Sequence, residues 1–85
     1  MNLYLISQES NTDYDTYSDA VVAAGGEDDA RTIHPDGDKL VPTGGELQDE
    51  QCGTWTCQDN VRVRLVGIAD AQIPRGVVCA SFHAG

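Results

Sequence analysis

The fold class is decided by residues 61–69, which read Val61-Arg62-Val63-Arg64-Leu65-Val66-Gly67-Ile68-Ala69. Apolar residues at 61, 63 and 65 alternate with arginines at 62 and 64, and this period of two is typical of a strand with one buried face. From Val66 onward the residues of opposite parity are apolar, which predicts either a bulge near Gly67 or a change in which face of the strand is covered. This is the clearest strand in the chain.

Apolar segments on both sides of this stretch predict further strands. Residues 2–7 are expected to form a strand, and the block Leu3–Ile6 within it is apolar on both parities, which is typical of a central strand covered on both faces. Residues 20–24 could form a helix or a strand, and the paired valines followed by two glycines favour a strand. Residues 77–82 are expected to form the last strand, and residues 54–56 a short strand with Trp55 as its anchor.

One short helix is predicted from Glu27 to about His34. Its first three residues are acidic, and acidic side chains are favourable at the N-terminus of a helix, where the helix dipole is positive. Ala30, Ile33 and His34 fall on one face of this helix. Pro35 should end the helix, and Pro35-Asp36-Gly37 is typical of a turn.

The predicted order is therefore β-β-α-β-β-β. It describes an α+β fold in which one small antiparallel sheet carries one short helix, within a single domain over residues 1–85. Residues 8–19 and 36–51 are polar and rich in turn-forming residues, so both are expected to be loops.

Length and charge exclude several classes of protein. The chain has 85 residues, too few for a barrel or a doubly wound nucleotide-binding fold. Its 14 acidic and 5 basic residues give a net charge of −9, which repels nucleic acids and anionic membranes and favours basic proteins or cations as partners. Residues 1–60 hold 13 acids and 2 bases, a net charge of −11, whereas residues 61–85 have a net charge of +2.

The cysteines and the N-terminus indicate a compartment. No segment approaches the length of a membrane span, and the N-terminal residues lack the features of a signal peptide. Cys52, Cys57 and Cys79 are an odd number without an export signal, which predicts reduced thiols in a cytoplasm. The C-x4-C pair is slightly wide and has no second pair, unlike tandem zinc-binding pairs. Zinc is therefore not predicted.

Cation binding and catalysis are weakly supported. Asp13, Asp15 and Asp19 share one loop and could hold a hard cation, but Ser18 and Ala24 occupy the positions where an EF-hand requires glycine and glutamate. A solvated loop is the favoured interpretation. The chain has no phosphate-binding loop, nucleophile elbow or paired-histidine motif, so we expect a protein that is not an enzyme and has no cofactor.

Several segments together resemble a known family. They are Leu3–Gln8, Tyr14–Tyr17, Ala20–Ala24, Ala30-Arg31, His34-Pro35 and Val77–Gly85. These segments resemble a family of small uncharacterised proteins from phages and prophages, and Trp55 and residues 61–68 fit the same layout, whereas residues 36–51 do not take part. The resemblance implies a phage or prophage context, where small acidic proteins are often inhibitors of host defence, including anti-CRISPR proteins. It supplies no catalytic residues, and the step to inhibition is an analogy of size, charge and origin.

The acidic residues are the candidate binding site. They could mimic a phosphate backbone on a Lys/Arg groove, or they could be a coat that keeps the protein in solution. Tyr14 and Tyr17 could be interface anchors or core residues, while Trp55 and Tyr4 are expected in the core. The candidate partner-binding residues are Asp13, Tyr14, Asp15, Tyr17, Asp19, Glu27, Asp28, Asp29, Asp36, Asp38, Glu46, Asp49 and Glu50.

The leading hypothesis is a binding protein that blocks a basic nucleic-acid-binding surface of a host protein or ribonucleoprotein complex, such as a CRISPR surveillance complex. It would contact neither nucleic acid nor membrane itself. The alternative is a structural or accessory phage protein that forms a homodimer through edge strands, with Arg62, Arg64 and Arg75 meeting the acidic face of the other copy. A metal-binding module is a third hypothesis.

Overall fold

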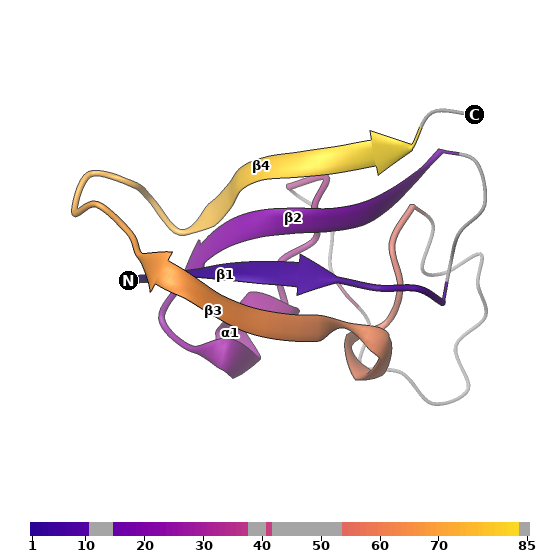
Figure 1. Cartoon of the computed structure of the whole chain (residues 1–85), viewed down its shortest axis with the longest axis horizontal. Coiled ribbons are helices and arrows are strands. Elements are labelled where there is room, and N and C mark those ends of the chain that lie inside the picture. Colours follow the sequence, from indigo (N-terminus) through magenta and orange to yellow (C-terminus); the bar gives the residue numbers. More distant parts are fainter. Residues whose placement is uncertain (11–14, 38–40, 42–53, 84–85) are drawn as a thin grey trace.

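A computed structural model describes residues 1–10, 15–37, 41 and 54–83 of the chain (Figure 1). Its elements, in chain order, are β1 (Asn2–Ser7), β2 (Thr16–Ala24), α1 (Glu27–Arg31), the 3-10 helix η1 (Gln58–Asn60), β3 (Arg62–Ile68) and β4 (Gly76–His83). The four strands form one antiparallel sheet in the order β3-β1-β2-β4. The prediction of a small antiparallel sheet with one short helix is confirmed, and β1 is a central strand as expected.

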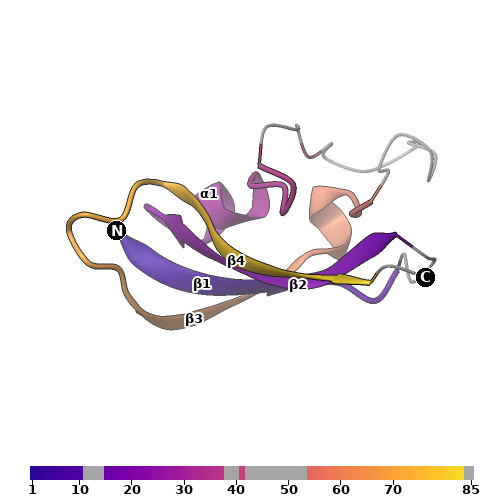
Figure 2. The same cartoon turned by 90° about the horizontal axis from the view of Figure 1, so that it is seen from above.

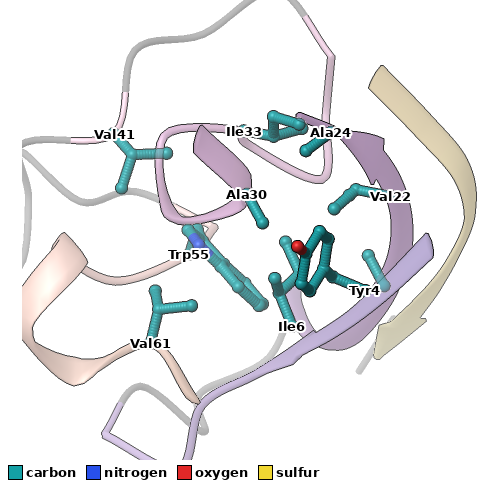
Figure 3. Packing of buried hydrophobic residues seen from close by; sticks show 10 residues of the cluster. Tyr4, Ile6, Val22, Ala24, Ala30, Ile33, Val41, Trp55 and Val61 are labelled. Atoms are coloured by element: carbon teal, nitrogen blue, oxygen red, sulfur yellow. The ribbon is translucent and has the colours of Figure 1, made fainter. Parts of the chain in front are cut away.

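One face of the sheet carries the core. Figure 2 shows α1, the segment that follows it and η1 on the same side of the sheet. Between them and the sheet lies an apolar cluster whose largest fully buried side chains are Trp55, Ile6 and Val22. In Figure 3 the indole of Trp55 lies between Val61 and Ile6, with Ala30 of α1 nearby. Burying side chains of this size contributes about 1.5–3 kcal/mol each, so this cluster is the main source of stability.

Residues 54–56 do not form the predicted strand; they are a turn and irregular backbone. Trp55 is fully buried in the core cluster, so the segment lies against the covered face of the sheet. The backbone N–H of Tyr17 in β2 donates a hydrogen bond to the carbonyl of Thr54 at 2.8 Å, without residues 54–56 forming a strand. The predicted fifth strand is therefore wrong because a large apolar side chain indicates burial and not extended pairing.

Two predicted boundaries also differ from the structure. The helix ends at Arg31, with Thr32 as its C-cap, so it is shorter than the eight residues predicted. β2 begins at Thr16, well before residue 20, because its polar N-terminal half pairs with β4 through Tyr17–Phe82 and Asp19–Ser81. An antiparallel sheet with one exposed face accepts polar residues in its strands. The polar composition of residues 8–19 therefore did not exclude a strand, and residues 16–19 belong to β2.

Three strands contain an extra residue. Val66 is the extra residue of β3, which confirms the bulge predicted near Gly67, and Ser18 and Val78 are the extra residues of β2 and β4. The bulge at Ser18 changes the parity of β2. Tyr17 is consequently packed against the core cluster, although Asp19 and Val21 lie on the opposite face.

The second face of the sheet has no cover among the described elements, and we call it the open face (Figure 2). Leu3 and Leu5 of β1 and Val21 of β2 lie at its centre, each partly exposed. The prediction that β1 is covered on both faces is therefore wrong within the described part of the chain. The apolar residues that motivated it are real, but α1 and Trp55 pack on one side alone.

Candidate binding surface

The first two residues of α1 present carboxylates to solvent. Glu27 and Asp28 are exposed, and the guanidinium of Arg31 lies 3.9 Å from a carboxylate oxygen of each. Arg31 is also drawn toward the sheet, because its Nε donates a hydrogen bond to the carbonyl of Val61 at 3.4 Å. Long, exposed pairs of this kind are weak and screened by salt, so both carboxylates remain available to a cationic partner.

Asp29, the third acid of α1, is engaged within the chain. Nη2 of Arg75 lies 2.8 Å from Oδ1 and Nε of Arg75 lies 3.0 Å from Oδ2, while the N–H of Gly25 donates to Oδ2 at 3.1 Å. The hydrogen bond from Arg75 holds the pKa of the Asp29 carboxyl below its ordinary value. This carboxylate therefore ties α1 to the loop before β4 and has little charge to offer a partner.

Tyr17 and Asp36 meet at the margin of the core. The Tyr17 ring packs edge-on against Phe82, with centroids 4.8 Å apart, and against His34 at 6.4 Å. Its hydroxyl donates to Oδ1 of Asp36 at 3.2 Å. The backbone N–H of Asp36 donates to Nδ1 of His34 at 3.0 Å, and Gly37, with φ of 98°, closes the predicted turn by donating to the carbonyl of His34. These contacts favour the core interpretation of Tyr17 over the anchor interpretation.

The other sequence-predicted residues are dispersed. Asp15 is exposed, with φ of 60°, in the turn immediately before β2. Asp19 is partly buried on the open face, in register with Ser7 and Ser81. Asp13, Tyr14, Asp38, Glu46, Asp49 and Glu50 lie outside the described residues.

One exposed acidic residue that sequence reasoning missed lies on η1, on the same side of the sheet as α1 (Figure 2). Asp59 is exposed on η1, two positions before Val61, whose carbonyl accepts the hydrogen bond from Arg31. In sequence it is an ordinary turn residue, about thirty positions from α1, and no local pattern could have linked it to Glu27 and Asp28. We call the surface formed by Glu27, Asp28, Asp36 and Asp59 the acidic side.

Positive charge gathers on the other face. Arg62 and Arg64 pair in register with Ser7 and Leu5, so they belong to the open face. Nη2 of Arg62 lies 3.5 Å from Oε2 of Glu9, whereas Arg64 makes no ion pair within the described part of the chain. Among the described residues, Arg62 and Arg64 are thus separated from the acidic side by the thickness of the sheet.

The described residues offer little support for a metal site. Among residues 1–10, 15–37, 41 and 54–83, no three His, Cys, Asp or Glu side chains come together in a way that could hold an ion. Cys57 is a free thiol beside the Asn60 amide, and Cys79 is a free, exposed thiol on the open face. Cys52 lies outside the described residues. None of the described helices has the length and apolar character needed to span a membrane.

Comparison with known proteins found no matching family model, no matching curated protein and no matching solved structure. The function is therefore inferred from the charge and geometry of this chain and from its resemblance to small phage proteins.

Proposed function

We propose that this chain is a small binding protein of the phage or prophage type, without enzymatic activity, whose acidic side blocks a basic nucleic-acid-binding surface of a host protein. The observation that carries the proposal is the exposure of Glu27 and Asp28 at the first turn of α1. Asp36, whose carboxylate accepts a hydrogen bond from Tyr17, and Asp59 of η1 are also exposed, and Figure 2 shows η1 and the segment after α1 on the same side of the sheet as α1. The described arginines that could neutralise this charge are either weakly paired with it or located elsewhere.

The physical basis is competition for lysine and arginine. A groove that binds DNA or RNA is lined by cations that contact phosphates, and carboxylates on a rigid surface can occupy the same cations. Such association is steered by charge, so its rate should fall as salt increases. The most specific version is an anti-CRISPR-like inhibitor that prevents a CRISPR surveillance complex from binding DNA, as the likeness to small phage proteins suggests.

Capture from a host lysate at low and high salt tests the general proposal. The double variant Glu27→Gln/Asp28→Asn should lose at least tenfold in affinity for the captured protein, because about 1–3 kcal/mol is lost with each desolvated charge contact. The matched control Glu9→Gln/Asp70→Asn removes the same net charge from outside the acidic side. Equal loss of binding in both variants would show that net charge, and not this surface, is responsible.

The specific version has a direct assay. Excess protein is mixed with a purified CRISPR surveillance complex at low salt, and DNA binding by the complex is measured. Inhibition by the native chain and by the control variant, but not by Glu27→Gln/Asp28→Asn, is expected. Unchanged DNA binding would reject the anti-CRISPR version.

A further inference from the structure

The open face has an apolar centre, which is typical of a sheet face that packs against another surface. Leu3, Leu5 and Val21 are partly exposed at its centre, and Leu5, Val21 and Cys79 line a shallow depression of about 150 Å³. Strands that are apolar on both parities, as β1 is, are typical of sheets buried on both faces. One face of β1 packs on the core cluster, so the apolar residues of its other face remain to be explained.

The charges around this apolar centre are arranged asymmetrically. Two adjacent rows cross the sheet from β3 to β4: Arg62-Ser7-Asp19-Ser81, and beside it Arg64-Leu5-Val21-Cys79. Positive charge therefore lies on β3 at one edge, and negative charge lies on Asp19 of β2. Within the described residues Asp19 makes no ion pair, although it is partly buried, and Arg64 is likewise unpaired.

We propose that the open face binds the open face of a second copy of this chain, forming a two-fold symmetric dimer. With the two-fold axis parallel to the strands, β1 lies over β2 of the second copy and β3 lies over its β4. Leu5 then meets Val21 of the second copy, and Arg62 and Arg64 lie within side-chain reach of its Asp19. Symmetry makes each of these contacts twice, so the charge pattern is complementary to itself.

The same charges disfavour the other face-to-face arrangement. An axis that runs across the strands would stack β3 on β3 and bring Arg62 and Arg64 of the two copies together. Pairing through strand edges is also disfavoured, because Val66 and Val78 interrupt both edge strands, β3 and β4, with bulges. Bulged edges are a known means of preventing strand addition.

The size of the face predicts a weak dimer. Four strands of six to nine residues cover a footprint of about 400–500 Å² at the usual strand spacing and rise. Stable interfaces bury about 800 Å² per partner, so we expect dissociation in the micromolar range or weaker. The acidic side points away from this interface, and the inference does not depend on the proposed function.

Sedimentation equilibrium of the full chain tests the dimer. Near physiological salt, where repulsion between two chains of charge −9 is screened, the mass should rise from 9.1 kDa toward twice that value between about 10 µM and about 1 mM. Val21→Lys should leave the chain monomeric throughout. The control Ile68→Lys changes an apolar residue that is 83% exposed but lies outside the apolar centre, and it should dimerise normally.

Charge reversal at Asp19 and Arg64 gives a second test of the same interface. Asp19→Arg and Arg64→Asp should each weaken dimerisation about tenfold. The double variant should dimerise more tightly than Asp19→Arg alone but less tightly than the native chain, because Arg62 still faces residue 19 of the second copy. Circular dichroism verifies that each variant is folded. A native chain that stays monomeric at about 1 mM overturns the proposal. The same result is expected if the open face binds a different protein and not a second copy of this chain. A dimer that survives Val21→Lys and both charge reversals also overturns it.

Discussion

Asp29 of α1 and Arg75 of the loop before β4 form a two-point ion pair across 46 positions of sequence, at 2.8 Å and 3.0 Å. Nη2 of Arg75 also donates to the hydroxyl of Thr32, the C-cap of α1. A helix of five residues is too short to be stable alone. This contact, together with the burial of Ala30, holds α1 on the sheet and so positions Glu27 and Asp28.

Removing this ion pair should destabilise the fold modestly. Arg75→Ala is expected to lower the free energy of unfolding by about 1 kcal/mol, because the pair is bidentate but partly exposed to water. The matched control Arg64→Ala removes an arginine that is unpaired among the described residues and should change stability much less. Urea denaturation of both variants measures the difference, and equal effects would show that the pair contributes nothing.

The same contact predicts a dependence on pH. The pKa of the Asp29 carboxyl is lowered from 3.8 in the folded chain by the hydrogen bond from Arg75. A lowered folded-state pKa stabilises the fold fully above the unfolded-state value, and this stabilisation is lost as the pH falls through the folded-state pKa.

The difference in unfolding free energy between the native chain and Arg75→Ala should therefore be constant near neutral pH and shrink below about pH 4. Denaturation curves collected from neutral to acidic pH provide the measurement. A difference that stays the same down to the lowest pH would be inconsistent with this assignment.

Trp55 should be the most sensitive core position. It is fully buried between α1 and the sheet, so Trp55→Ala should cost about 3–5 kcal/mol and leave a chain of this size largely unfolded. Trp55→Phe retains most of the apolar contact and should be less destabilising. Chemical denaturation followed by circular dichroism tests this order, and a well-folded Trp55→Ala variant would contradict it.

Two substitutions of Tyr17 distinguish the contribution of its ring to stability from the contribution of its hydroxyl. Tyr17→Phe loses the hydrogen bond to Asp36 but keeps the ring on Phe82, so it should cost no more than about 1 kcal/mol. Tyr17→Ala also loses the contacts with Phe82 and His34, and it should cost about 2 kcal/mol or more. If Tyr17→Ala is as stable as Tyr17→Phe, the ring does not contribute to the core.

Local patterns in the chain were enough to predict most of the sheet. Alternation in residues 61–69, apolar blocks at residues 2–7 and 77–82, and the turn at Pro35-Asp36-Gly37 all act over a few residues. Such patterns reflect backbone preferences and the spacing of side chains, which are properties of a short segment. For the same reason the acidic first turn of α1 could be located without a structure.

The errors concern what each segment packs against. Trp55 indicates burial equally well in a strand or in a segment that crosses a sheet, and the apolar residues of β1 do not reveal which face α1 will cover. The state of each carboxylate is also non-local. Asp29 is neutralised by an arginine 46 positions away, while Glu27 and Asp28 beside it stay exposed, because only folding brings the β3–β4 loop to α1.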